Sequence, residues 1–369
     1  MHYTVLILVF GVLSGCFTEI RAQTPPGDKD EVIRVDTQLV DVPVAVTSAA
    51  GVPVRGLKNT NFVLYEDGKR QEVVDFSTAS EPFEVALLLD TSGSTRSDLQ
   101  LIQRAAIEFV GSLRMGDRVS VTAFQTERDA TRAYAITDPL SGLTSDRAAL
   151  KAAIERAKMS GGTPYYDSLI EIAEKVFRDP PGEAFRGRRA LVALTDGVDS
   201  SSSSDIAEIK EKLGKLGIIC FFIKVDTRDY FEEGLLGDCQ SATRFSTAQI
   251  RRYYRTVNAK GNFEKAVTFC QLGEFERLAV SKKLYEIADA EMNDLARVSG
   301  GKVFPVAELS DARNAFKAVA DEIGTKYTLG YYPTNEKRDG AYRKIKVELK
   351  GVPAGTVVRA REGYTAPAK

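Results

Sequence analysis

The sequence predicts an α/β protein in which a doubly wound, mostly parallel sheet is inserted into a small β-sandwich formed by the N- and C-terminal strands. Three observations lead to this fold class. Residues 85–89 and 190–194 are uninterrupted apolar runs, as in strands that are buried on both faces of a parallel sheet. Amphipathic stretches alternate with such runs, which is the order of a doubly wound sheet. Both ends of the chain carry segments with two-residue alternation, and only together do they supply enough strands for a sandwich.

The same patterns place the individual elements. Residues 62–76 read as a hairpin that turns at Asp67-Gly68, and further terminal strands are expected at 327–333, 342–349 and 356–361. The α/β part is expected to have additional strands at 118–124, 132–136, 218–225 and 302–306, and helices at 99–113, 148–159, 165–177, 206–216, 291–298 and 310–323. The resulting division is a signal peptide (1–22), a linker (23–30), an N-terminal β segment (31–80), an α/β domain (83–323) with an insertion at about 226–287, and a C-terminal β segment (325–366) that pairs with the N-terminal one.

Composition excludes several classes of function. The chain has 369 residues, of which 43% are hydrophobic and 27% charged, so it can bury a sizeable core. Fifty basic residues against fifty-one acidic ones give a net charge of -1, and no overall field favours nucleic acid or anionic lipid. The single histidine, His2, lies in the expected signal peptide. The mature chain therefore has no histidine for a catalytic triad or for a zinc site.

Oxygen-bearing side chains follow two of the buried strands and precede one helix. Asp90, Ser92 and Ser94 come directly after the run at 85–89, and Asp196 follows the run at 190–194. Thr163 is expected to be the N-cap of the helix at 165–177, with a proline at the first helical position. Because open α/β sheets bind ligands at the carboxyl ends of their strands, these oxygens are expected to meet at one edge. Hard oxygen ligands suit Mg²⁺, Mn²⁺ or Ca²⁺.

These five positions resemble the metal-ion-dependent adhesion site of von Willebrand factor type A domains. The resemblance covers roughly residues 83–323, and the terminal segments are similar to those of secreted proteins with such domains from acidobacteria. It implies that Ser92, Ser94 and Thr163 contact the metal, with Asp90 and Asp196 acting directly or through water. It also implies a protein partner that presents an Asp or Glu to the metal. A neighbouring second site of the integrin type is not expected, since residues 95–98 contain a single acid.

Three functions are compatible with this site. The first is a secreted, divalent-cation-dependent adhesion or interaction module without enzymatic activity, which the complete set of five oxygen donors and the missing histidine favour. The second is a metal-dependent hydrolase, for which Asp199 or Asp205 would be the nearest candidate for a general base. The third is an envelope scaffold in which the metal only stabilises the loops.

The first residues of the chain indicate export. They form an apolar stretch that is too short to span a membrane comfortably and resembles a secretory signal, although basic residues are missing from its start. We favour cleavage after Ala22, which gives a secreted or periplasmic protein. Cleavage before Cys16, in a lipobox-like context, would instead attach the protein to a membrane through a lipid at this cysteine.

The insertion at about 226–287 is absent from the plain pattern of the domain. It contains Cys239 and Cys270, which could form a disulfide in an oxidising compartment. Cys220 lies within an apolar strand and is expected to be a buried thiol. The arginine and tyrosine run at 250–255 could contact a partner or form a solvated helix face. The insertion could also cap the metal edge, and the sequence does not decide its position.

Overall fold

The computed structural model describes residues 39–78, 81–93, 99–239, 245–257 and 269–368. The expected signal peptide with Cys16, the linker at 23–30 and the site residue Ser94 lie outside the described residues. The chain divides into Met1–Asp36 and Thr37–Lys369, and the description below concerns the second unit. None of its described helices is both long and apolar enough to cross a lipid bilayer.

The order of elements confirms the alternation expected in the α/β domain. The strands are β1 (Val40–Thr47), β2 (Phe62–Glu66), β3 (Lys69–Gln71), β4 (Asp75–Ser77), β5 (Glu84–Leu89), β6 (Arg118–Arg128), β7 (Ala133–Thr144), β8 (Arg189–Thr195), β9 (Ile219–Val225), β10 (Lys302–Val306), β11 (Tyr327–Tyr331), β12 (Tyr342–Leu349), β13 (Val357–Ala360) and β14 (Gly363–Thr365). The helices are α1 (Leu99–Ser112), α2 (Arg147–Glu155), α3 (Tyr165–Glu171), α4 (Ile206–Lys215), α5 (Arg228–Glu233), α6 (Thr247–Val257), α7 (Glu274–Ser299) and α8 (Ala312–Ile323).

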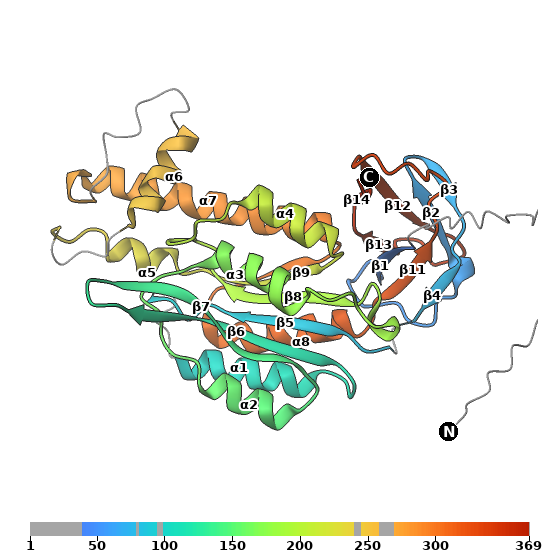
Figure 1. Ribbon diagram of the computed structural model, residues 1–369, viewed down its shortest axis with the longest axis horizontal. Coiled ribbons are helices and arrows are strands. Elements are labelled where there is room, and N and C mark those ends of the chain that lie inside the picture. The colour runs from blue at the N-terminus through green and yellow to red at the C-terminus, as the bar shows by residue number, and fades with distance from the viewer. Residues whose placement is uncertain (1–38, 79–80, 94–98, 240–244, 258–268, 369) are drawn as a thin grey trace, which may run out of the picture. The chain divides into compact units, whose positions relative to one another are not determined.

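The central sheet has the strand order β10-β9-β8-β5-β6-β7. All neighbouring pairs are parallel except β6 and β7, so the sheet is mostly parallel, as predicted. The short edge strand expected at 132–136 belongs to the longer β7. Helices α1, α2 and α8 cover one face of the sheet, and α3, α4 and α7 cover the other (Figure 1). Strand β5 is therefore buried along its whole length, which explains its uninterrupted apolar sequence.

The strand order brings the ends of β5 and β8 together. The chain continues from β5 to β6 on one side, whereas β8 pairs with β5 on the other side. Their register places Leu89 beside Leu194, and the Asp90 backbone N–H donates to the Leu194 carbonyl at 2.9 Å. This reversal of strand order is where ligands bind to open α/β sheets.

The N- and C-terminal strands pair with each other, as predicted. One four-stranded sheet has the order β13-β1-β11-β4 and the other β14-β12-β2-β3. Val42 of β1 lies opposite Leu329 of β11, and Leu64 of β2 lies opposite Val347 of β12. Apolar side chains from both sheets form one core, so the two sheets are the layers of a sandwich. Each sheet combines strands that precede and follow the α/β domain, which confirms that this domain is inserted.

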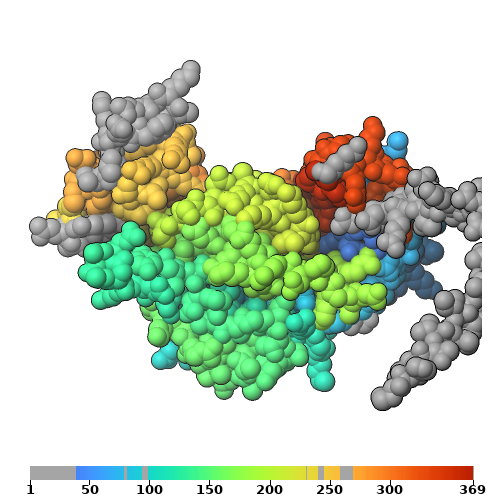
Figure 2. Space-filling view, in the orientation of Figure 1, coloured from blue at the N-terminus to red at the C-terminus, as the bar shows by residue number. Residues whose placement is uncertain are grey.

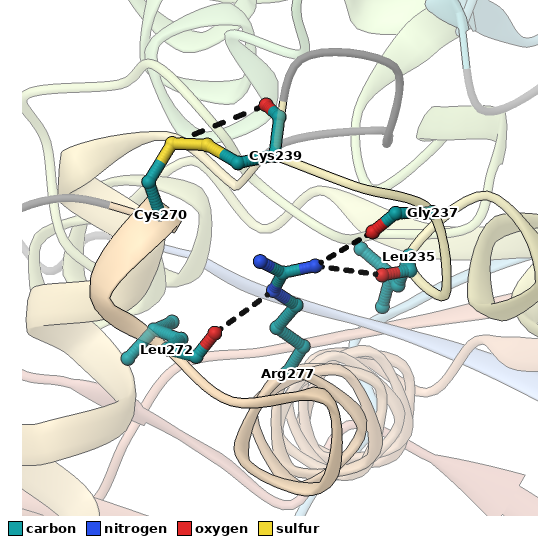
Figure 3. Close-up of a disulfide and its surroundings, with 6 residues drawn as sticks. All are labelled: Leu235, Gly237, Cys239, Cys270, Leu272 and Arg277. Atoms are coloured by element: carbon teal, nitrogen blue, oxygen red, sulfur yellow. Dashed lines mark hydrogen bonds between the residues drawn. A yellow bond between two sulfur atoms is a disulfide. The ribbon is translucent and has the colours of Figure 1, made fainter.

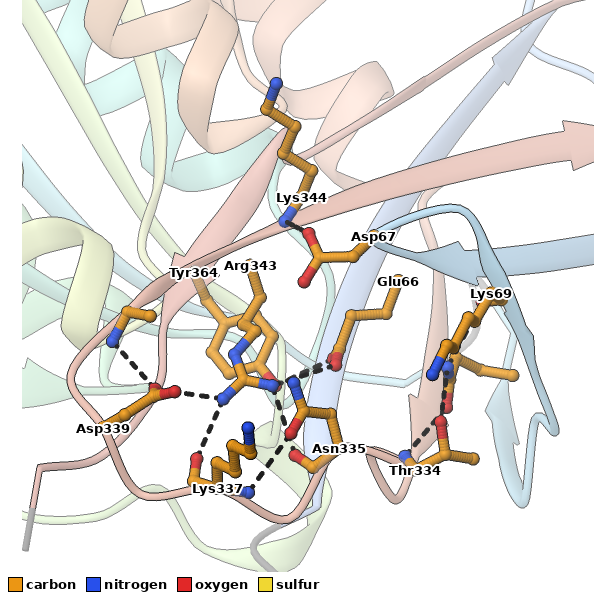
Figure 4. Close-up of polar contacts among 12 residues, drawn as sticks. Glu66, Asp67, Lys69, Thr334, Asn335, Lys337, Asp339, Arg343, Lys344 and Tyr364 are labelled. Atoms are coloured by element: carbon orange, nitrogen blue, oxygen red, sulfur yellow. Dashed lines mark hydrogen bonds and ion pairs between the residues drawn. The ribbon is translucent and has the colours of Figure 1, made fainter.

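A buried carboxylate links four strands of the sandwich. Glu66 of β2 accepts hydrogen bonds from the hydroxyl of Tyr331 at 2.6 Å and from that of Tyr364 at 2.9 Å. Its carboxylate also lies 3.7 Å from the Arg343 guanidinium, as Figure 4 shows together with Tyr364. These partners belong to β11, β14 and β12. The turn after Glu66 is the predicted one, with positive φ at both Asp67 (47°) and Gly68 (80°). Such a turn matches the twist of a two-residue hairpin.

A buried lysine and a buried arginine lie where the sandwich meets the α/β domain. The Lys326 ammonium donates to the Gly300 carbonyl at 2.8 Å, and burial lowers the pKa of Lys326 to about 8. The Arg188 guanidinium donates to the Glu81 carbonyl at 2.9 Å and lies over the Phe83 ring. Both side chains are inaccessible to solvent, so the junction is held by polar groups that have lost their hydration.

Several expected helix boundaries differ from the structure. Helix α2 ends at Glu155 rather than near 159, and α3 ends at Glu171 and continues as a π-helical turn, Ile172–Val176. Pro164, rather than Thr163, is the N-cap of α3, and no side chain caps this helix. The reason is that the Thr163 backbone already bonds to Ser200, as described below. The helix expected at 291–298 begins at Glu274, so the expected end of the insertion near residue 287 lies inside α7.

Candidate metal centre

The loop after β5 holds the first carboxylate of the candidate site. Asp90 Oδ1 accepts hydrogen bonds from the Ser92 backbone N–H at 2.9 Å and from the Ser92 hydroxyl at 2.5 Å. Its Oδ2 accepts from the Thr195 hydroxyl at 2.6 Å. Asp90 and Ser92 are both buried. Thr195 is the last residue of β8, so the first and third loops of the site are joined directly.

The second loop carries Thr163 and is bonded to the first. The Ser160 N–H donates to the Thr91 carbonyl at 2.8 Å, and Ser160 forms a parallel bridge with Ser92. A Cβ at Gly162 would lie 3.0 Å from that of Ala135, so this loop also passes close to β7.

The third loop carries Asp196 and is bonded to the second. The Thr163 N–H donates to the Ser200 hydroxyl at 2.7 Å, and the Ser200 N–H donates to the Thr163 carbonyl at 3.0 Å. Asp196 Oδ1 accepts from the Val198 N–H at 2.9 Å. The turn between them requires Gly197, whose φ is 73°. The structure thus joins three loops that are far apart in the chain, and Asp90, Ser92, Thr163 and Asp196 are all buried there.

Placing the charges of Asp90 and Asp196 together in a buried site costs free energy. Burial and, after it, the charge of Asp196 together raise the pKa of Asp90 to about 7. Two ionised carboxylates in a buried site repel each other unless a cation lies between them. The donors are hydroxyl and carboxylate oxygens, which are the ligands that hard divalent cations prefer. The residues present therefore fit a Mg²⁺-type cation, which would supply a positive charge able to bind a further oxygen.

The acids considered as general bases are placed differently. Asp205 is the N-cap of α4 and accepts from the N–H groups of Ala207 at 2.9 Å and Glu208 at 3.0 Å, so its role is structural. Asp199 is buried near the site and accepts from the Ser202 N–H at 3.2 Å. Burial raises its pKa to about 6. Within the described residues, no group of three or more His, Cys, Asp or Glu side chains could hold a metal.

Sequence analysis missed two residues beside Asp196. Its Oδ2 accepts from the Thr227 hydroxyl at 2.7 Å, and this hydroxyl lies 2.8 Å from that of Tyr285. Thr227 follows the carboxyl end of β9, which pairs with β8. The rule used for the loops after β5 and β8 could have identified it. No sequence pattern identified Tyr285, because the contact of its hydroxyl with Thr227 depends on which face of α7 is turned towards the site.

The insertion packs against the candidate site. Arg252 of α6 donates to both oxygens of Glu291 of α7 at 2.7 Å, and its guanidinium lies over the ring of Tyr166 in α3. In Figure 2 the yellow surface of α6 adjoins the green surface over α3 and α4. The arginine and tyrosine run is thus partly a packing surface of α6, although Arg251 and Arg255 are exposed.

A disulfide and an arginine fix the fold of the insertion. Cys239 and Cys270 are bonded, and Cys220 is a buried thiol, as expected. Buried Arg277 donates to the carbonyls of Gly237 at 3.0 Å and Leu272 at 3.1 Å, close to the two cysteines (Figure 3). The insertion also has an apolar core of its own, formed by Leu235, Phe245, Ile250, Phe269, Leu272, Val280 and Leu284.

Comparisons with known proteins support the interpretation of the central part of the chain. Residues 85–198 match a family model described as "von Willebrand factor type A domain". This segment contains β5, β8 and four of the five expected ligands in described positions. A search of curated proteins returned no match.

The chain also matches solved structures that are distant from it in sequence. Proximal thread matrix protein 1 from the mussel byssus is 15% identical at a TM-score of 0.41, with 75% of this chain and 51% of that chain covered. The present chain thus spans about half of the mussel protein. BatB from Bacteroides thetaiotaomicron is 19% identical at a TM-score of 0.37, covering 65% of this chain and 97% of that chain. A von Willebrand factor type A protein from Catenulispora acidiphila is 11% identical at a TM-score of 0.40, covering 90% and 75%.

Proposed function

Because the chain carries a von Willebrand factor type A domain, we propose that it is a divalent-cation-dependent module for binding another protein. The proposed ligands are Asp90, Ser92, Ser94, Thr163 and Asp196. The carboxylates act directly or through water, and Mg²⁺ is the proposed cation, with Mn²⁺ and Ca²⁺ as alternatives of the same chemistry.

One observation carries this proposal. Hydrogen bonds join the three loops to each other, from Ser160 to Thr91, from Thr163 to Ser200 and from Thr195 to Asp90. Each bond involves an expected ligand or a residue next to one in the chain. The described ligands are therefore held at one edge of the sheet by the protein itself, and a cation entering there meets a largely ordered set of oxygens.

The donor set indicates the chemistry of the partner. Two carboxylates and neutral hydroxyls leave a divalent cation with ligand positions that water or an outside oxygen can fill. A carboxylate supplies such an oxygen together with negative charge. We therefore propose that the partner protein presents an Asp or Glu to the metal, as in adhesion.

The proposed location is outside the cytoplasm. The Cys239–Cys270 disulfide supports this, since structural disulfides persist mainly in oxidising compartments. The protein would be secreted or reside in the periplasm or cell envelope, with lipid attachment at Cys16 as the alternative to free secretion.

We propose a binding role rather than catalysis. A hydrolase would need a general base beside the metal, and Asp205 is engaged as the cap of α4. A screen for hydrolysis of esters, phosphates and peptides checks this. Turnover that requires the metal and is lost in Asp199→Asn would favour the enzyme instead.

Calorimetric titration with Mg²⁺ and Mn²⁺ tests the site. We expect saturable one-to-one binding by the wild type and loss of binding in Asp90→Ala and Asp196→Ala. Asp205→Asn is the matched control, because it removes a carboxylate charge from a neighbouring loop and leaves an oxygen to cap α4. Equal affinity in all four proteins would contradict the proposed ligands.

A further inference from the structure

We propose that the insertion contributes positioning residues to the metal centre, in the form of a buried hydroxyl relay from Tyr285 through Thr227 to Asp196. This inference rests on the proposed function and concerns how the Asp196 carboxylate is held. It makes the insertion a structural part of the cation site.

The direction of the relay follows from the chemistry of its groups. An ionised carboxylate only accepts hydrogen bonds, so the Thr227 hydroxyl donates to Asp196 Oδ2 across 2.7 Å. The single proton of that hydroxyl is then used. Consequently the Tyr285 hydroxyl donates to the Thr227 oxygen across 2.8 Å. Both side chains are buried, with exposed fractions of 6% each, so bulk water does not compete for these bonds.

The Thr227 side chain does not cap the helix that begins after it. It is the N-cap residue of α5, where a threonine side chain normally accepts from the backbone at the start of the helix. Here its side chain makes no capping bond. The hydroxyl is directed to the carboxylate instead, which indicates that this position serves Asp196 more than α5.

The relay is anchored in the insertion. Tyr285 lies on α7, and the Phe231 ring of α5 meets it edge-on with ring centres 6.5 Å apart. Phe231 in turn packs against Phe245, a member of the insertion's apolar core. The position of the Tyr285 hydroxyl therefore depends on the same packing that the disulfide stabilises.

The relay fixes the orientation of the Asp196 carboxylate that a cation would meet. Asp196 is held from both sides, by Val198 N–H at Oδ1 and by Thr227 at Oδ2. Groups that orient a metal ligand without touching the metal commonly change metal affinity by about 10- to 100-fold when removed. Removing the relay takes away the donor at Oδ2 and leaves the carboxylate less restrained, so the cation must complete its ordering on binding.

Calorimetric titration with Mg²⁺ alone tests the relay. Thr227→Val keeps the shape but removes the hydroxyl, and we expect the Kd to rise by about 10-fold. Thr227→Ser keeps the hydroxyl and should bind like the wild type. Tyr285→Phe should weaken binding by a smaller factor, and it should cause no further loss in the Thr227→Val background. Tyr254→Phe is the matched control, since it makes the same chemical change in the insertion, where Tyr254 bonds to Glu276.

The outcomes separate this inference from the proposed function. If Asp196→Ala abolishes binding but Thr227→Val and Tyr285→Phe bind within twofold of the wild type, the relay is refuted and the metal site stands. If Asp196→Ala binds normally, the metal site itself is refuted. Should Thr227→Val fail to fold, Tyr285→Phe decides, because it removes one oxygen atom from a side chain that keeps its packing.

Discussion

Removing the Cys239–Cys270 disulfide should loosen the insertion without unfolding the sheet. The insertion has an apolar core separate from the two cores that cover the faces of the central sheet. Units with separate cores often open on their own, before global unfolding. The double variant Cys239→Ser/Cys270→Ser should therefore act mainly on α5 and α6.

The length of the loop gives the size of the effect. The two cysteines are 31 residues apart. On the loop-entropy model such a cross-link stabilises the closed form by about 3 to 4 kcal/mol. Because 1.4 kcal/mol corresponds to a factor of ten, amide exchange through opening of the insertion should become several hundred-fold faster, on the order of 10²–10³. Arg277 and the apolar core remain, so the insertion should still close.

Hydrogen exchange followed by mass spectrometry measures this effect. Peptides from α5 and α6 should exchange faster in the double variant, and peptides from β5 and β8 should be unchanged. Reduction of the wild type should reproduce the pattern, whereas reductant should not alter the double variant. Unchanged exchange in α5 and α6 would refute the stabilising role. Equal acceleration in β5 and β8 would show that the insertion unfolds only together with the sheet.

Two further predictions concern the junction and the third loop. The pKa of Lys326 falls from 10.5 in the unfolded chain to about 8 in the folded protein, so the unfolded state binds more protons between these values and stability rises with pH there, by up to about 3 kcal/mol. In urea unfolding at pH 8 and pH 10, the difference in unfolding free energy between the wild type and Lys326→Met should therefore shift in favour of the wild type at the higher pH. Gly197→Ala should lower the unfolding free energy by about 1 to 3 kcal/mol, because φ is 73° and the new Cβ would lie 2.8 Å from Met292 Cε. Gly214→Ala, in an open part of α4, is the control and should be neutral or stabilising in the same unfolding assay.

The parts that sequence predicted well depend on local rules of strands. Strands β5 and β8 are covered by helices on both faces, so polar residues occur only at their ends and the runs 85–89 and 190–194 are wholly apolar. Their ends must meet at the same edge because the strands are parallel. That rule alone placed Asp90 and Asp196 in the same region. The pairing of the terminal strands could be predicted because each end alone has too few strands to bury its apolar residues in a sandwich.

The parts that sequence could not predict depend on contacts between distant segments. Thr163 has a suitable residue type for an N-cap, but its backbone is bonded to Ser200, and the helix begins after Pro164. The start of α7 was placed too late, because residues 274–290 pack partly on the insertion rather than on the sheet and so show a mixed pattern. In both cases tertiary contacts outweighed the local signal.

The partners of the two carboxylates explain why the site suits a cation. Asp90 accepts from the hydroxyls of Ser92 and Thr195, and Asp196 accepts from that of Thr227. Hydroxyl donors such as these orient a carboxylate without neutralising its charge. The folded chain thus fixes the direction of two like charges that repel each other, which is costly for the protein alone. A divalent cation placed between the two carboxylates would offset that repulsion.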